Sequence, residues 1–197
     1  QSEKFTFQNE LISNIICSNE SLIFTLTNIE NLLFWIDTQN SIRKAKKVAE
    51  EVSGMDLSNV DIIYTLETNA SLVGGESAGA ALTIATIAAL ENKTINESVI
   101  ITGTIEEDGS IGKVGGIILK GEAAKESGAS LFLVPKGQGK VESYKPVTKC
   151  EKRAFMTFCI TNYELQRVNV GEKIGIEVRE VSNIQEALKS VSYTHLT

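Results

Sequence analysis

The longest apolar run of this chain, residues 78–90, places the strongest constraint on its fold. It reads AGAALTIATIAAL and contains no charged residue, so a helix over Ser77–Leu90 is apolar on nearly every side. Such a helix has to be covered by other elements all round. The run is shorter than the roughly 18 residues that a membrane-spanning helix needs and is rich in alanine and threonine. We therefore expect a soluble domain built around one buried helix.

The remaining pattern indicates a mixed arrangement of strands and helices. Helical spacing predicts helices over 40–53, 116–127 and 184–190, and short apolar runs predict strands over 21–28, 32–36, 60–66, 99–105, 131–134 and 174–181. Gly54 and Gly128 are expected helix stops, and Asp108-Gly109 is a hairpin turn signal. Ser182 with Gln185 is typical of a capping box for the last helix.

These elements predict one α+β domain over residues 1–192, with mixed sheets and helices packed around the buried helix. Residues 1–36 contribute N-terminal strands, and residues 193–197 form a tail that fits no pattern. The chain of 197 residues begins with Gln1 rather than Met, so we expect a piece of a longer protein.

The charge balance and the rare residues exclude several classes of function. A net charge of −6 without a basic stripe argues against a nucleic-acid binder. The only histidine is His195, so neither a Ser–His–Asp triad nor a multi-histidine metal site is expected. The three cysteines form no C-x-x-C pair. Cys150 and Cys159 bracket a short segment that fits a hairpin, and both a disulfide and two buried thiols remain open.

The glycine turn Gly74-Gly75 places Ser77 in the first turn of the buried helix. Backbone N–H groups there lack intrahelical partners and lie at the positive end of the helix dipole, which suits an oxyanion. The competing interpretation is that Ser77 is a helix N-cap, a position that serine favours. On this motif alone the cap is the more common role.

Lys120 lies on the apolar stripe of the helix predicted over 116–127. Its neighbours at helical spacing are Gly116, Ile117, Ala123 and Ala124, whereas Lys125 should face water. A lysine there either extends its ammonium to the surface or is buried and more easily deprotonated. A neutral lysine is a general base, and a serine–lysine pair is a known variant of nucleophilic catalysis.

The runs GGESAG, IITG and KVGGIILKGEAAKESGA together closely resemble the proteolytic domain of Lon, an energy-dependent serine peptidase. The family's serine, its lysine after a Gly-Gly pair and its threonine fall on Ser77, Lys120 and Thr102, with the family's interval from serine to lysine kept. The resemblance runs from about residue 40 to 134 and, more weakly, into the last strand and helix. It leaves residues 1–36 and 136–170 uncovered.

Within this family the chain most resembles a divergent archaeal branch of Lon-like serine peptidases. Members of that branch carry an Asp-Thr-Gln element, which corresponds to Asp37-Thr38-Gln39 in this chain. Some members are exported or membrane-attached and lack the ATPase module. Asn-x-Ser/Thr sequons occur at Asn19, Asn69, Asn92 and Asn96. The protein is expected to be either cytoplasmic or membrane-associated or exported. The resemblance favours a membrane-associated or exported location. Membrane contact is expected only through segments outside this chain.

The resemblance implies that Ser77 and Lys120 form a catalytic dyad that hydrolyses peptide bonds in unfolded proteins or peptides. Thr102 would help to hold the lysine amine, and the backbone amides of Ser77 and Ala78 would hold the oxyanion. The resemblance also implies a homo-oligomeric ring, typically a hexamer, and no cofactor or metal in this chain, any ATPase module lying outside it. Two residues depart from the family: Glu76 replaces a common proline, and Gly74 replaces an aspartate of some members.

Two alternatives belong to other functional classes. A catalytically silent, ring-forming interaction module on the same fold predicts no peptide hydrolysis. A small-molecule kinase would place the Gly-Gly-x-Ser turn on a nucleotide phosphate. The position of Lys120 on an apolar face argues against the kinase, as does the lack of paired carboxylates for magnesium.

Overall fold

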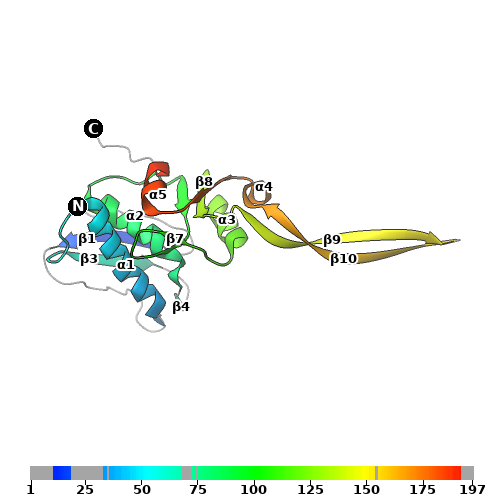
Figure 1. Ribbon diagram of the computed structural model, residues 1–197, viewed down its shortest axis with the longest axis horizontal. Helices are drawn as coiled ribbons and strands as arrows, with labels where there is room; N and C mark the ends of the chain where they lie inside the picture. The colour runs from blue at the N-terminus through cyan, green and yellow to red at the C-terminus, as the bar shows by residue number, and fades with distance from the viewer. Residues whose placement is uncertain are drawn as a thin grey trace.

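Helix α2 (Gly79–Leu90) lies inside the fold, as its apolar sequence predicts. Every residue from Gly79 to Ala88 is buried in the computed structural model. Helix α1 (Ile36–Ser53) packs along it, and strands and helix α5 (Ile184–Ser190) cover other sides (Figure 1). The structure describes residues 11–18, 33–34, 36–67, 72–73, 75–153 and 155–191.

The remaining elements surround this helix or extend from the body that it centres. The other helices are the 3-10 helix η1 (Glu76–Ala78), α3 (Ile117–Glu126) and α4 (Val170–Ile174). The strands are β1 (Leu11–Ser18), β2 (Leu33–Phe34), β3 (Asp61–Glu67), β4 (Leu72–Val73), β5 (Val99–Ile101), β6 (Thr104–Ile105), β7 (Ile111–Gly112), β8 (Leu131–Pro135), β9 (Lys140–Arg153), β10 (Met156–Asn169) and β11 (Glu177–Val181).

The sheets are both parallel and antiparallel. Strands β11, β8 and β5 form a parallel sheet in that order, with β8 in the middle and buried along its whole length. The pairs β1–β3, β6–β7 and β9–β10 are antiparallel, and β2–β4 is parallel. The predicted turn at Asp108-Gly109 joins β6 to β7, with Gly109 at φ +78°. The fold is therefore α+β, as predicted.

Apolar clusters on several sides of α2 hold these layers together. Ile84 and Ile87 join β5, β8 and α5 in one cluster, while Leu82 and Ala85 join α1 and β3 in another. A third cluster packs α3 and α4 against β8 around Phe132. Because α2 contributes to two of the three clusters, its start is fixed relative to both α1 and the parallel sheet.

Several predicted boundaries were wrong. Helix α1 begins at Ile36 rather than residue 40, and its first turns bury the polar residues Thr38 and Ser41. The strand expected over 99–105 is interrupted after Ile101 and continues as β6 in a different sheet. Residues 170–174, expected to be loop and strand, form α4, with Asn169 accepting a hydrogen bond from Glu172 N.

The cap of the last helix is shifted by one residue from the predicted box. Asn183, not Ser182, is the N-cap, and its side chain accepts a hydrogen bond from Glu186 N at 2.9 Å. The Glu186 carboxylate in turn accepts one from Ser182 N at 2.8 Å. Glu186 therefore takes the part assigned to Gln185. The strand predicted over 21–28 and the tail at 193–197 lie outside the described residues.

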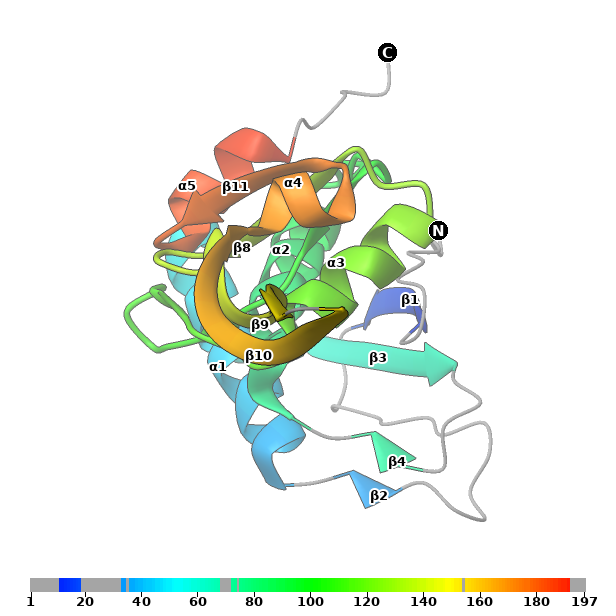
Figure 2. The same cartoon turned by 90° about the vertical axis from the view of Figure 1, so that its right-hand side faces the viewer.

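The largest difference from the sequence pattern is a long two-stranded arm formed by β9 and β10, which projects away from the body (Figures 1 and 2). Only a short hairpin had been expected around residues 151–158. Cys150 and Cys159 lie directly opposite each other in the arm, are exposed and form a disulfide. Of the two interpretations that the sequence left open, buried thiols are therefore wrong. Among the described helices, none has both the length and the apolar character needed to cross a membrane.

Candidate active site

Ser77 lies in η1, at the entrance of the buried helix α2. Gly75 precedes it at φ +110°, a conformation that residues with a side chain rarely adopt, and so turns the chain into η1. The N-cap positions are Gly75 for η1 and Ala78 for α2, and neither helix has a side-chain cap hydrogen bond. The interpretation of Ser77 as a helix N-cap is therefore wrong. Its side chain, in a half-buried residue, is not used to begin either helix.

The backbone of Ser77 is held by the segment that links β5 to β6. Gly103 N donates a hydrogen bond to the Ser77 carbonyl oxygen at 3.0 Å, and the Thr102 hydroxyl donates to the same oxygen at 3.3 Å. Thr102 is 6% exposed, and its own N–H donates to Leu133 O in β8. Thr102 thus connects the Ser77 turn to the parallel sheet. Its oxygen still has a lone pair that can accept from an amine.

Two glycines allow this close approach. A Cβ on Gly79 would lie 2.8 Å from both Ile105 Cγ2 and Ile105 N, and one on Gly103 would lie 2.4 Å from Ile111 Cγ2. These distances are too short for heavy atoms that are not bonded to each other. A glycine at position 79, two residues after Ser77, is therefore required by the packing of α2 on β6.

Lys120 occupies the second turn of α3. Gly116 at φ +68° is the N-cap, and Lys120 N donates to Gly116 O at 2.9 Å. Ile117, Gly121 and Ala124 form the buried face of the helix, and Lys120 is half-buried beside it. The predicted position on the apolar side is thus confirmed in part.

Lys125, five residues later, is exposed, as predicted. Lys120 and Lys125 therefore occupy different surroundings on one helix. The contact between Lys120 Nζ and Ser77 Oγ stays a prediction, as does the role of Thr102 in holding the amine.

Glu76, the departure from the family pattern next to Ser77, is half-buried and lies in a network of charges. Lys44 of α1 donates a hydrogen bond to Glu106 at 2.7 Å, which raises the pKa of Lys44 above its ordinary value despite some opposing desolvation. The negative charge of Glu76 adds to this rise. The Lys44 ammonium therefore partly balances the carboxylate beside Ser77.

The described residues contain no cluster of three or more histidine, cysteine, aspartate or glutamate side chains suited to a metal ion. A hollow of about 580 Å³ at the base of the arm is lined by Lys140, Arg167 and Glu180 among others, and no residue of η1 lines it. Neither observation adds a residue to the neighbourhood of Ser77.

Known proteins resemble this chain in the region that contains both Ser77 and Lys120. The model of the Lon protease (S16) C-terminal proteolytic domain matches residues 36–157. The archaeal Lon protease of Thermoplasma volcanium is 33% identical over 97 residues, which cover 49% of this chain and 15% of that protein. The archaeal Lon protease of Thermococcus kodakarensis is 31% identical over 114 residues, 58% of this chain and 18% of its own length.

A bacterial relative extends the same similarity. Lon protease 2 of Bacillus subtilis is 28% identical over 119 residues, which cover 60% of this chain and 17% of that protein. The chain thus matches less than a fifth of the length of these three relatives. Nearly all of β10 lies beyond the residues that the family model matches.

Proposed function

Because the chain belongs to the family of the Lon protease (S16) C-terminal proteolytic domain, we propose that it is a serine endopeptidase with a Ser77–Lys120 dyad. The observation that carries the proposal is the state of Ser77. Its carbonyl oxygen is held by Gly103 and Thr102, while its hydroxyl caps neither η1 nor α2. A serine fixed by its backbone in this way keeps its hydroxyl for chemistry.

In the first half of the reaction, Ser77 Oγ attacks the carbonyl carbon of a peptide bond while the neutral Lys120 amine takes the hydroxyl proton. The carbonyl oxygen becomes an oxyanion. The N–H groups of Ser77 and Ala78 lie at the start of the helical segment, at the positive end of its dipole, and would donate to it. The C–N bond then breaks, and Lys120 returns the proton to the leaving amine.

In the second half, Lys120 takes a proton from water, and the water oxygen attacks the acyl carbon. The bond to Ser77 Oγ breaks, and the proton on Lys120 goes to the serine oxygen. We assign Thr102 to hold the lysine amine through the free lone pair of its hydroxyl. The cycle requires the neutral form of the Lys120 amine, since that is the form in which an amine acts as a general base.

The substrates that we propose are unfolded proteins or peptides, and the assembly a homo-oligomeric ring, possibly a hexamer. The chemistry uses only side chains and backbone amides, so we propose no cofactor in this chain, with any ATPase module outside it. The exposed Cys150–Cys159 disulfide supports an oxidising location, as expected of an exported or membrane-associated protein.

The test compares the wild type with Ser77→Ala, Lys120→Ala and the matched control Lys125→Ala on fluorogenic peptides and an unstructured protein. Lys125 lies on the same helix but is exposed, so its variant separates loss of the base from loss of a positive charge. We expect turnover to fall at least about 1,000-fold in the first two variants and to stay unchanged in the third. The wild-type rate should rise with pH as Lys120 loses its proton.

A second readout examines the nucleophile directly. A fluorophosphonate should label Ser77 in the wild type, as located by peptide mass spectrometry, and should not label Ser77→Ala. Equal turnover in all four proteins would show that the dyad assignment is wrong. An absence of both hydrolysis and labelling in the assembled wild type would favour the silent, ring-forming module.

A further inference from the structure

The tip of the β9–β10 arm exposes apolar side chains that nothing in the described part of the chain covers. Phe155, at the turn, is fully exposed. Met156, Phe158 and Ile160 alternate along β10 and are 63%, 53% and 65% exposed. Exposed apolar side chains gathered at one end of a molecule indicate a surface that meets a membrane or another protein.

The strand register gives these side chains no apolar partner across the hairpin. The three apolar residues of β10 share one face, and each lies opposite a charged residue of β9, namely Arg153, Glu151 and Lys149 in that order. Hairpins are stabilised where apolar residues face apolar residues, or where opposite charges face each other. The pairing within the arm therefore does not account for an apolar row at the tip.

The exposed apolar residues nearer the base, which we call the shaft residues, are arranged differently. Tyr144 lies directly opposite Leu165, and Pro146 opposite Tyr163 is the next pair on that face. Apolar pairs of this kind stabilise a hairpin from within. The shaft residues thus have a role in the arm itself, and the tip residues are the ones that require a partner.

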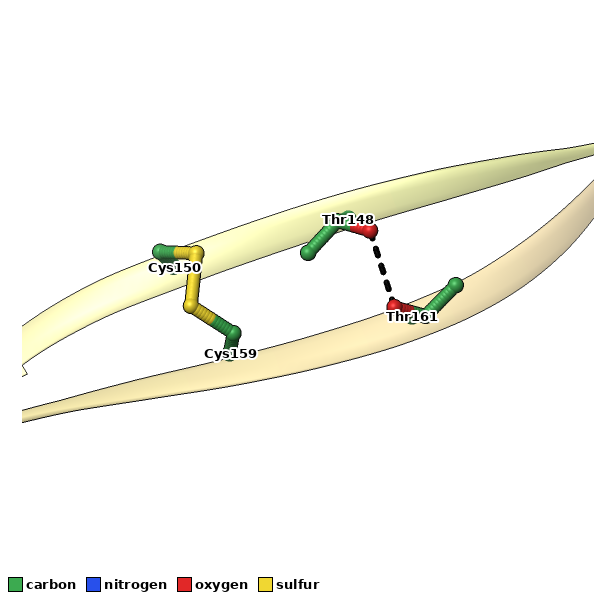
Figure 3. Close-up of a disulfide and its surroundings, with 4 residues drawn as sticks. All are labelled: Thr148, Cys150, Cys159 and Thr161. Atoms are coloured by element: carbon green, nitrogen blue, oxygen red, sulfur yellow. Dashed lines mark hydrogen bonds between the residues drawn. A yellow bond between two sulfur atoms is a disulfide. The ribbon is translucent and has the colours of Figure 1, made fainter.

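The arm is held in shape close to its tip. The Cys150–Cys159 disulfide joins the two strands, and two residues nearer the base the Thr148 and Thr161 hydroxyls form a hydrogen bond of 2.8 Å on the same face (Figure 3). A segment that is already ordered loses less conformational entropy when it binds. The tip is therefore prepared for a contact.

The tip is basic, whereas the chain outside the arm is acidic. Residues 148–161 contain three basic residues and one acidic residue, and the positions outside 140–169 contain 13 basic and 22 acidic residues. Lys149 and Lys152 are exposed and leave the ribbon on opposite faces, because three positions separate them along a strand. Positive charge on both faces suits a partner that surrounds the tip.

The length of the arm separates the basic tip from the acidic body. Each strand has 14 residues, so the arm extends for about 45 Å at the usual rise of a strand and projects away from the body (Figures 1 and 2). At physiological ionic strength, charges interact over about 8–10 Å. An anionic surface at the tip would therefore attract the lysines without repelling the body.

We propose that the tip inserts end-on into an anionic lipid surface, with Phe155, Met156 and Phe158 at the boundary between headgroups and acyl chains. Phe158 lies two residues from Met156, about 7 Å along the strand, within the depth of about 5–10 Å that interfacial apolar side chains reach. Ile160 and Lys149, two residues further, lie at the level of the headgroups, where an ammonium meets phosphate.

A folded protein is a less suitable partner for this tip. It would cover one face, on which Lys149 is accompanied by Glu151, and would leave Lys152 on the other face without a counter-charge. A lipid surface receives both lysines at once. The sequence pattern predicts membrane contact only through segments outside this chain, so the tip would be an additional contact within it.

The test measures co-sedimentation with vesicles of phosphatidylcholine alone and of phosphatidylcholine mixed equally with phosphatidylglycerol. We expect the wild type to bind the mixed vesicles at least about tenfold more tightly. Phe155→Ser/Phe158→Ser should lower that binding at least about tenfold. Leu119→Ser is the matched control and should bind as the wild type does, because Leu119 is 72% exposed but lies on α3. All these positions are exposed, so the circular dichroism spectra should be unchanged.

Charge variants test the electrostatic part of the contact. A basic residue near an anionic surface strengthens binding roughly fivefold. Lys149→Gln/Lys152→Gln should therefore lower binding to the mixed vesicles at least about tenfold and leave binding to phosphatidylcholine unchanged. Glu151→Gln removes the one negative charge of the tip and should strengthen binding to the mixed vesicles several-fold. Added salt should reduce the difference between the two kinds of vesicle.

The insertion does not depend on the chemistry of Ser77, so Ser77→Ala should bind vesicles as the wild type does. This keeps the failure of the peptidase proposal distinct from the failure of this one. Equal binding of the wild type to both kinds of vesicle would overturn the lipid contact, as would full binding by Phe155→Ser/Phe158→Ser. If that variant keeps vesicle binding but loses mass in sedimentation velocity, the partner is a second copy. If it keeps vesicle binding but hydrolyses an unstructured protein more slowly, the partner is the substrate.

Discussion

Substitution of Gly79 by alanine should destabilise the domain and displace Ser77. The added Cβ would lie 2.8 Å from Ile105 Cγ2 and from the backbone nitrogen of Ile105. Since a backbone atom cannot rotate away, we expect an overpacking cost near the upper end of the usual range, about 3 kcal/mol. Alanine regains about 1 kcal/mol of helix propensity, which leaves a net loss of about 2 kcal/mol. For a domain of this size the Tm should fall by about 4–8 °C.

The same displacement should reduce catalysis beyond the loss of stability. Relief of the contact moves α2 away from β6 and so shifts Ser77 relative to the Thr102–Gly103 segment that holds its carbonyl oxygen. A misplacement of this kind lowers turnover by roughly 100-fold. Calorimetry gives the Tm, and peptide hydrolysis, measured well below the Tm of the variant, gives the rate.

The matched control is Gly115→Ala. A Cβ there meets no heavy atom within 4 Å, and the residue is exposed. Its Tm should equal that of the wild type or exceed it slightly, because alanine restricts the unfolded chain. If Gly79→Ala melts with the wild type, or if Gly115→Ala loses as much stability, the packing argument is wrong.

The remaining predictions concern the base and the tip of the arm. Hydrogen bonds from the N–H groups of Gly137 and Gly139 lower the pKa of Glu180, so the stability they provide is present above the ordinary value of about 4.5 and is lost as the pH falls below it. Glu180→Gln should weaken this acid dependence in urea unfolding, and a variant that keeps the wild-type profile would contradict it. Loss of the disulfide in Cys150→Ser/Cys159→Ser should accelerate amide exchange in β9 and β10 while the Tm of the body stays constant; a Tm lower by several degrees would show that the arm supports the body.

The identity of the central elements was readable from local chemistry. The run over 78–90 has no polar face, so its burial as α2 follows from composition alone. The turn at Gly109 and the helix stop at Gly54 also follow from local chemistry, because both glycines adopt positive φ values that other residues avoid. The different sides of the helix assigned to Lys120 and Lys125 followed from helical spacing. That spacing fixes the direction in which each side chain leaves the helix, without reference to the rest of the fold.

Other features had signals that were easy to misread. Asn169 before α4 and Gly175 after it are ordinary cap and stop residues, yet a five-residue helix has too little periodicity to reveal itself. The cap of α5 was misplaced because Ser182 and Asn183 are both good capping residues, and only the direction of the Glu186 side chain distinguishes them. The arm lacks a buried face, so no core-facing row of residues marked its full length, although apolar and polar residues alternate over 156–161.

The sequence by itself indicated the candidate reactive residues, one serine at the start of a buried helix and one lysine on the apolar side of another helix. It also indicated the family whose model matches the region that contains both. Tertiary structure alone decided that Ser77 caps no helix, that its carbonyl oxygen is held by Gly103 and Thr102 from the distant segment between β5 and β6, and that two cysteines meet in an exposed arm. The physical reason is the separation along the chain of the residues that interact. Composition and periodicity report on interactions within a few residues of the chain, whereas hydrogen bonds, close packing and exposure between segments exist only after folding has brought those segments together.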